Sequence, residues 1–235
     1  MERPLEPPIE SASVSSSEDR FAAELRGFGA LGILAILVIL AGNFIFPPLS
    51  AVLALLWASR SRTPWSELGF VRPTSWLLTI AGGIVFGVAF KLAMKSLVMP
   101  LLGADPINHA YHYLAGNRAA IPGTLFLMIV VAGFGEETLF RGYMFERLRR
   151  LFGQGRGATM GTVLGTSVYF GALHYSTQGL AGAEQAIITG LVFGTIYAAT
   201  RRIWLLIVTH AAFDLMAYAL IYWNLETRVA HWFFH

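Results

Sequence analysis

The sequence predicts an all-α protein, a polytopic bundle of about seven transmembrane helices, or eight, with a functional site inside the bundle. Composition is the first observation: 55% of the 235 residues are hydrophobic, only 13% are charged, and the mean hydropathy is +0.59. Soluble domains usually have about a quarter of their residues charged. The second observation is a series of long apolar segments. The third is that several of these segments contain ionisable residues, which usually mark a functional site inside a membrane.

The chain divides into a tail, a membrane domain and a second short tail. Residues 1–24 are rich in proline, serine and acidic residues, so we expect them to be disordered. The transmembrane domain covers residues 25–223, and a short aromatic tail covers 224–235. Apolar segments predict spans at residues 28–46, 49–59, 77–99, 121–150, 158–175, 183–200 and 203–223. The second segment is short, because a hydrocarbon core of ~30 Å needs about 20 residues.

Glycines four residues apart predict places where two helices approach closely. Such pairs are Gly83 with Gly87, Gly161 with Gly165, and Gly190 with Gly194.

The distribution of arginines predicts the orientation. Most of the seventeen basic residues lie in the N-terminal tail and in the connections after the second, fourth and sixth spans. The positive-inside rule therefore places the N-terminus in the cytoplasm, and we expect a bacterial plasma membrane. The balance of 17 basic against 14 acidic residues is too even to indicate nucleic-acid binding. The absence of cysteine excludes disulfides, thiolate catalysis and thiolate metal ligands.

The functional hypothesis starts from residues 133–141, at the end of an apolar run. Glu137 and Arg141 are four apart, so the spacing predicts an ion pair on one helix face. Glu136 lies about 100° round the helix and is not committed to that arginine. The spacing therefore assigns Glu137 and Arg141 to structure and Glu136 to proton transfer.

Two later spans carry further candidates. Phe170 and His174 share a helix face, and His210 and Asp214 have the spacing at which a carboxylate orients an imidazole. Ionisable groups inside a membrane usually face one another or a cavity. Residues from three separate helices therefore predict one shared site.

These residues resemble the motifs of a known family. The motifs, in order, are Glu136-Glu137-x-x-x-Arg141, Phe170-x-x-x-His174 and His210-x-x-x-Asp214. They resemble the three motifs of the CPBP family, also called the Abi or type II CAAX prenyl endopeptidase family of intramembrane proteases. The resemblance covers about residues 64–218. It implies hydrolysis of a peptide bond in a membrane-associated protein or peptide, with a CAAX-type or peptide-maturation substrate in the lipid bilayer.

The resemblance also implies roles for individual residues. Glu136 and His174 would activate the attacking water, and His210 and Asp214 would bind the oxyanion. The family frequently has asparagine at the position of Asp214, and an ionised aspartate would repel an oxyanion. Either Asp214 is protonated, or it orients a cationic His210 that becomes the donor. The spacing of four residues favours the second interpretation.

Two alternatives stay open at this point. Glu136, His174 and His210 could hold Zn²⁺ as in a metalloprotease, although the same residues can activate water directly and the HExxH signature is absent. The alternative function is non-hydrolytic: a proton-coupled transporter, or an immunity or scaffold protein, using the same buried charges.

If the helices are straight and rise ~1.5 Å per residue from the arginine-rich side of the membrane, His174 lies at a different depth from Glu136 and His210. The three residues can lie at one depth only if the fifth span starts later, near Gly161. We therefore predict that residues 153–157 form a loop within the membrane interface. A helix beginning at Arg156 without a kink would weaken the site.

Overall fold

A computed structural model describes residues 17–234, and its regular elements in that range are all helical. The N-terminal elements are α1 (Ser17–Arg26), α2 (Ala30–Ile45), α3 (Pro47–Arg60), η1 (Trp65–Leu68), α4 (Trp76–Ala93), η2 (Met94–Val98) and α5 (Met99–Leu101). The middle elements are η3 (His112–Leu114), η4 (Arg118–Ala120), α6 (Ile121–Phe126), η5 (Leu127–Glu136), η6 (Thr138–Met144) and α7 (Phe145–Phe152). The last three are α8 (Arg156–Thr200), α9 (Trp204–Tyr222) and α10 (Glu226–Ala230). The predicted helical bundle is confirmed.

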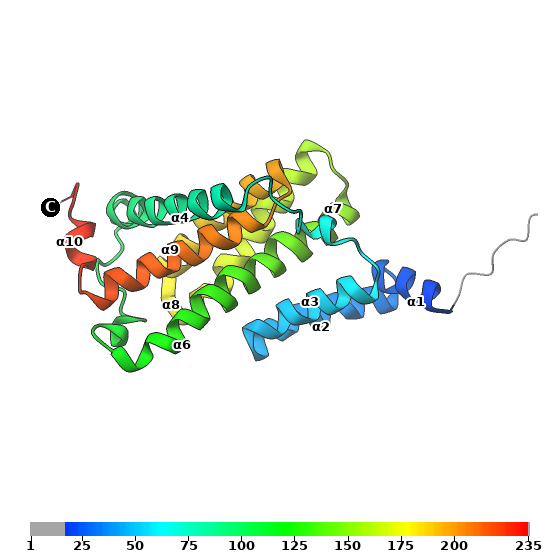
Figure 1. Ribbon diagram of the computed structural model, residues 1–235, viewed down its shortest axis with the longest axis horizontal. Coiled ribbons are helices and arrows are strands. Elements are labelled where there is room, and N and C mark those ends of the chain that lie inside the picture. The colour runs from blue at the N-terminus through cyan, green and yellow to red at the C-terminus, as the bar shows by residue number, and fades with distance from the viewer. Residues whose placement is uncertain (1–16, 235) are drawn as a thin grey trace, which may run out of the picture.

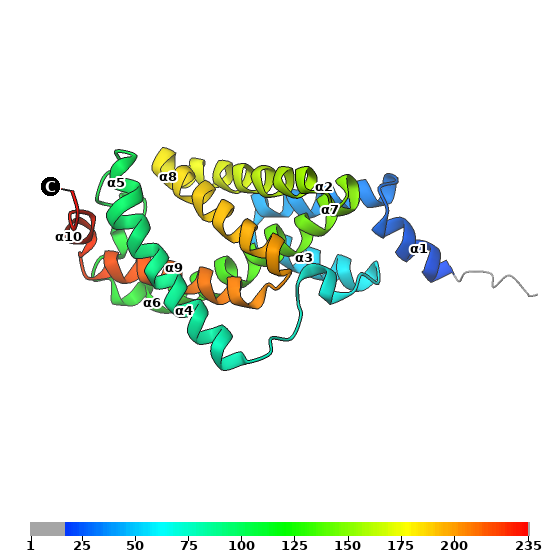
Figure 2. The same ribbon diagram turned by 90° about the horizontal axis from the view of Figure 1, so that it is seen from above.

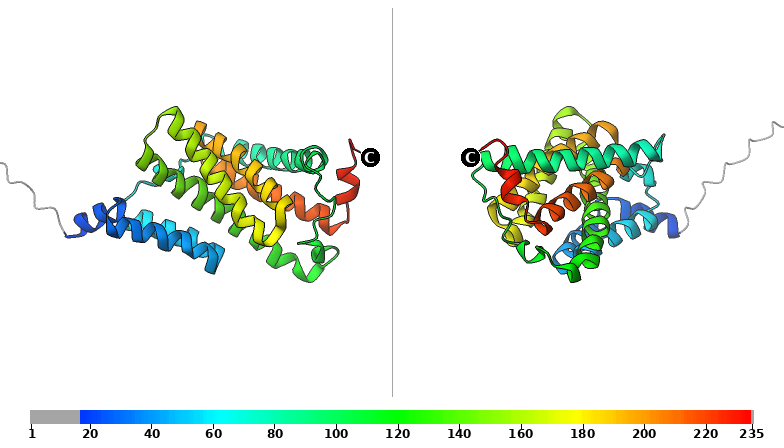
Figure 3. Two further views of the ribbon diagram at one scale, coloured as in Figure 1. Left: turned by 180° about the vertical axis from the view of Figure 1, so that it is seen from behind. Right: turned by 60° about the vertical axis from the view of Figure 1, so that its left-hand side comes forward.

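The helices form one elongated bundle with two distinct ends. Figure 1 shows α1, α7 and the arginine-rich connection 61–75 toward one end, while α10 and the segment 102–120 lie at the other. The helix α4 packs along α9, which also contacts η5 (Figure 3). The helices α2 and α3 form a hairpin that packs on η5 and η6 through α3.

The apolar helices make this chain an integral membrane protein. Four stretches are long and apolar enough to cross a membrane, Trp76–Leu101, Arg118–Phe152, Arg156–Thr200 and Trp204–Tyr222. There are five if α1 and α2, which are bent by 58°, count as one span. The predicted count of seven or eight spans stays a prediction. The helices α2 and α3 have only 16 and 14 residues, and α8, in which the sequence predicts two spans, is one of the four long stretches.

The helix α8 consists of two helices that meet at Gly179. This glycine has φ 66° and ψ −163°, a conformation that residues with a side chain rarely adopt. Figure 2 shows the two halves inclined to one another. The break falls between the two segments that the apolar pattern predicts, 158–175 and 183–200.

The predicted loop at 153–157 is wrong in extent, because α8 begins at Arg156. The expectation that such a start would weaken the site is also wrong, since His174 still lines the same cavity as Glu136 and His210. The depth count assumed straight, parallel α-helices. The helices are instead mutually inclined (Figure 2), and η5 and η6, on either side of Glu137, are π-helical, so the count does not apply.

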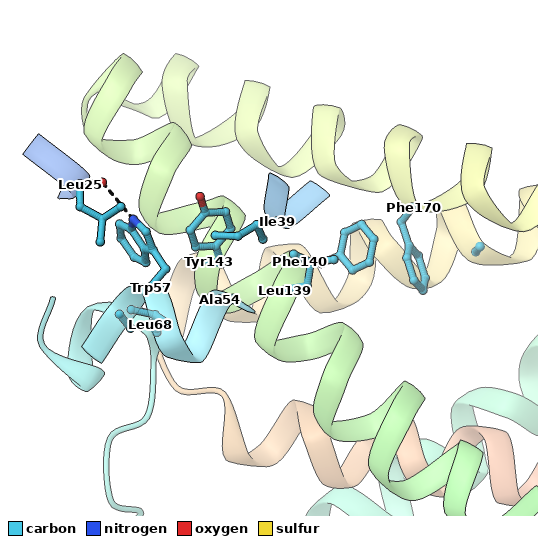
Figure 4. Close-up of a cluster of buried hydrophobic side chains, with 11 residues drawn as sticks. Leu25, Ile39, Ala54, Trp57, Leu68, Leu139, Phe140, Tyr143 and Phe170 are labelled. Atoms are coloured by element: carbon cyan, nitrogen blue, oxygen red, sulfur yellow. Dashed lines mark hydrogen bonds between the residues drawn. The ribbon is translucent and has the colours of Figure 1, made fainter. Parts of the chain in front are cut away.

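Both predicted tails contain helix. The tail predicted to be disordered over 1–24 overlaps α1; residues 1–16 lie outside the described range. The helix α1 is held because Leu25 is buried and its carbonyl accepts a hydrogen bond of 3.0 Å from Nε1 of Trp57 (Figure 4). The C-terminal tail includes α10, in which Glu226 and Val229 are buried.

The first glycine pair brings α4 against α9. A Cβ added to Gly83 would lie 2.7 Å from the Val208 side chain, and one added to Gly87 would lie 2.3 Å from the Thr209 carbonyl oxygen. Only glycine permits this approach, because real Cβ contacts are longer. The close contact fixes the position of α9, which carries His210.

The other two pairs differ from one another. A Cβ on Gly190 would lie 2.9 Å from Cα of Ser167, and Gly194 is also tightly packed, so this pair joins the two halves of α8 as predicted. The prediction for Gly161 and Gly165 is wrong, because a Cβ on either would meet no described atom within 4 Å. These two glycines lie on a face of α8 that the described helices do not cover.

Candidate active site

Glu137 is the centre of the buried polar network. Its side chain is fully buried, and its Oε1 accepts hydrogen bonds from Nη1 of Arg141 at 2.9 Å and from Nδ1 of His210 at 2.7 Å. The guanidinium of Arg141 also lies 5.2 Å from the centre of the Phe170 ring. The structure brings Glu137 and Arg141 together as their spacing predicts. The bond to His210 was not predicted, because it joins two helices that are far apart in sequence.

The second nitrogen of His210 faces two other carboxylates. Nε2 lies 3.7 Å from Oε2 of Glu136 and 3.7 Å from Oδ2 of Asp214. Because Nδ1 donates to Glu137, Nε2 is the nitrogen left for a reactant. The hydrogen bond that orients the imidazole thus comes from Glu137 and not, as the spacing favoured, from Asp214. Asp214 lies on the same helix as His210 but reaches only the opposite side of the ring.

His174 is fixed by its own helix. Its Nδ1 lies 2.8 Å from the carbonyl oxygen of Phe170. A carbonyl oxygen only accepts, so Nδ1 carries the proton and Nε2 of the neutral ring keeps its lone pair. The Phe170 ring packs edge to face on His174 at 4.5 Å and on Phe140 at 4.8 Å (Figure 4 shows the two phenylalanines). Phe170 therefore connects the helix of His174 to η6.

Close packing behind His174 adds to this positioning. A Cβ on Gly171 would lie 2.3 Å from the Ile187 side chain, so the two halves of α8 are in contact next to the histidine. The neighbour of the Phe170-Gly171-Ala172 segment is thus the second half of α8.

One cavity of about 290 Å³ joins these residues. Its titratable lining includes Glu136, His174, His210 and Asp214, and its apolar lining comes from η5, α8 and α9. Oε2 of Glu136 is buried and has no hydrogen-bond partner among the described residues. Of the two adjacent glutamates, the one that the sequence left uncommitted is therefore the one that lines the cavity.

The cavity has polar lining that the sequence analysis did not assign. Lys91, Tyr111, Gln178 and Gln185 contribute to it. Burial raises the pKa of the Tyr111 phenol, and the charges of Asp214 and Glu136 act in the same direction, so the hydroxyl stays protonated. Lys91 was visible in the sequence as a charge inside the third span, and that was the signal available.

The zinc option does not fit the arrangement. Within residues 17–234, no three His, Asp or Glu side chains lie close enough together to hold a metal ion. Glu136, His174 and His210 share the cavity without converging on one point.

Fold and cavity together define a class of protein: a helical integral membrane protein in which four helices place titratable side chains in one largely apolar cavity. Residues 118–216 match the family model described as type II CAAX prenyl endopeptidase Rce1-like. The segment contains all three motifs, so the resemblance is confirmed. No curated protein and no solved structure matches the chain.

Proposed function

We propose that the protein is an intramembrane endopeptidase that hydrolyses a peptide bond in a membrane-associated protein or peptide, of CAAX type or in peptide maturation. The observation that carries the proposal is the carboxylate of Glu136, which makes no hydrogen bond to a described residue and lines a cavity that His174 and His210 also line. A carboxylate without hydrogen-bond donors in an apolar setting is suited to accept a proton.

The attacking nucleophile is a water molecule between Glu136 and His174. Glu136 takes one proton as the water oxygen bonds to the carbonyl carbon, and Nε2 of His174 accepts a hydrogen bond from the other proton. The tetrahedral intermediate collapses when the carbon–nitrogen bond breaks. Glu136 then returns its proton to the leaving amine.

His210 stabilises the oxyanion. Its Nδ1 proton is bonded to Glu137, and the carboxylates of Glu136 and Asp214 on the other side favour a proton on Nε2. That N–H donates to the developing oxyanion. Loss of one such donor typically costs about 10²- to 10³-fold in rate. Asp214 stabilises the imidazolium and does not itself contact the oxyanion.

We also infer a cytoplasmic N-terminus, in a bacterial plasma membrane, with seven passes in total. Support comes from the gathering of the connections 61–75, 153–155 and 201–203 toward the α1 end of the bundle (Figure 1). These connections and their flanking residues are rich in arginine, as expected of the cytoplasmic side. The seven passes count α2, α3 and each half of α8 separately.

Cleavage by purified protein tests the function. Detergent-purified protein is incubated with a peptide library, and products are identified by mass spectrometry. We expect wild type to cleave and Glu136→Gln to lose at least about 100-fold in rate, because a general base contributes about 10²- to 10⁴-fold. Glu184→Gln is the matched control, since Glu184 lies in α8 outside the cavity lining, and it should cleave like wild type.

The alternative function has a different outcome. A proton-coupled transporter would give substrate-dependent proton flux in proteoliposomes and no cleavage products. An immunity or scaffold protein would give neither. Absence of cleavage by wild type, or equal cleavage by wild type and Glu136→Gln, would overturn the proposal.

A further inference from the structure

Lys91 is a buried cation in α4 that lacks a carboxylate partner. Its Nζ donates a hydrogen bond of 2.9 Å to Oε1 of Gln185 and lies 4.8 Å from the centre of the Phe213 ring. Among the described residues, no carboxylate lies within salt-bridge distance of this ammonium group, although the residue is only 6% exposed. A charged side chain inside a membrane usually has a counter-charge or a function.

The neighbouring lysine shows how the protein satisfies such a charge. Lys95 lies one helical turn further along, and its Nζ is 3.5 Å from Oε1 of Glu226. The same ammonium also bonds to the carbonyl of Pro106. The fold therefore supplies a carboxylate for Lys95 and leaves Lys91 with only a neutral amide.

Lys91 lies where two cavities adjoin. It lines the active-site cavity and a second cavity of about 190 Å³, which extends to the segment 104–110 at the end of the bundle away from the arginine-rich connections. The amide side chains of Asn108, Gln178 and Gln185 line both cavities as well. An ammonium group and several amide N–H donors form a suitable environment for a carboxylate.

We propose that Lys91 is a specificity-determining residue that binds a carboxylate of the substrate at the junction of the two cavities. This inference rests on the proposed endopeptidase function and names the substrate class: peptides with a carboxylate near the scissile bond. The carboxylate belongs either to the free C-terminus or to an acidic side chain. Its binding supplies the direct ion pair that no described carboxylate makes with Lys91.

Three peptide pools of matched random composition test the proposal. One pool has free C-terminal carboxylates, one is amidated, and one is amidated with a single aspartate at a fixed position. We expect wild type to cleave at least one carboxylate-containing pool about tenfold faster than the plain amidated pool, because hydrogen bonds to charged groups are worth about that factor or more. The carboxylate-containing pool that is cleaved faster shows whether Lys91 binds the C-terminal carboxylate or an acidic side chain.

Two variants assign this preference to one lysine. Lys91→Met should reduce the preference to less than about twofold. Lys95→Met should retain it, because Lys95 already has Glu226 as partner. If Lys91 serves only to balance the charge of Asp214, Lys91→Met would lower cleavage of all pools equally and keep the preference, and that result would overturn the proposal. A wild type without preference would also overturn it.

Binding separates this proposal from the proposed function. Retention of the same fluorescently labelled pools is measured on immobilised Glu136→Gln protein, with and without Lys91→Met. If the protein is no protease but Lys91 binds carboxylates, the acid pools will be retained in a Lys91-dependent manner without any cleavage. If the pools bind equally to both proteins, the carboxylate site is refuted whether or not wild type cleaves.

Discussion

At the residue scale, two adjacent glutamates have opposite environments. Glu137 is fully buried and its Oε1 bonds to both Arg141 and His210, whereas Glu136 lines a cavity and makes no hydrogen bond to a described residue. The difference follows from helix geometry, because neighbouring residues project about 100° apart. One carboxylate therefore holds the site together, and the other is available to a substrate or to water.

The same substitution at these two positions should have opposite effects on stability. Glu137→Gln leaves the buried Arg141 without its counter-charge, and breaking a buried pair in this way typically costs about 3–5 kcal/mol. We expect a markedly lower melting temperature in detergent. Glu136→Gln removes a buried charge that makes no hydrogen bond to a described residue, so its melting temperature should equal or exceed that of wild type.

Thermal unfolding of both purified variants, followed by circular dichroism, checks this prediction. Loss of activity in Glu136→Gln must occur with the fold retained. Equal melting temperatures for the two variants would contradict the different roles of the two carboxylates.

At the scale of elements, the contact between α4 and α9 determines where His210 lies. Gly83 and Gly87 let α4 reach the backbone of α9, and a Cβ on Gly87 would meet the carbonyl oxygen of Thr209 at 2.3 Å. Thr209 directly precedes His210. A small change on α4 should therefore reach the site through the backbone of α9.

Gly87→Ala should lower both stability and cleavage. Overpacking of this kind typically costs about 1–3 kcal/mol, and backbone atoms of α9 cannot yield as a flexible side chain can. The control is Gly82→Ala on the same helix, where a Cβ would meet no described atom within 4 Å. Melting temperature and cleavage rate are measured for both, and equal losses in the two variants would refute the role of the close approach.

At the scale of the whole molecule, the two ends of the bundle differ in charge and in relation to the cavities. The arginine-rich connections lie toward the α1 end (Figure 1), and the second cavity lies against the segment 104–110 at the other end. The proposed carboxylate site is thus displaced from the catalytic residues toward the end that we assign to the outer side. Orientation in the membrane decides from which side that cavity is reached.

Cysteine labelling determines the orientation directly, because the chain contains no cysteine. Ser66→Cys and Ala119→Cys place single thiols at exposed positions near opposite ends of the bundle. We expect a membrane-impermeant maleimide to label only the second variant in intact cells and both after permeabilisation. The reverse pattern would place the N-terminus outside and contradict the inferred topology.

The sequence by itself determined the helical membrane class, the resemblance to a family and the residues that could carry chemistry. Apolar length and intramembrane charge are local properties, so composition and spacing reveal them. The pairing of Glu137 with Arg141 was accessible for the same reason, since it lies within one helix. The spacing of Gly83 and Gly87 also predicted their close packing against another helix. Gly161 and Gly165 have the same spacing but contact no described helix, so spacing alone does not show which helix face is packed.

Only the tertiary structure decided how the helices meet. The bond between Glu137 and His210 joins side chains 73 positions apart, and the inclination of the helices brings His174 to a cavity from which straight-helix counting separated it. That no described carboxylate lies within salt-bridge distance of Lys91 likewise depends on all the helices around it. Spacing fixes what lies on one helix face, whereas contacts between helices depend on crossing angles and close packing that no single segment encodes.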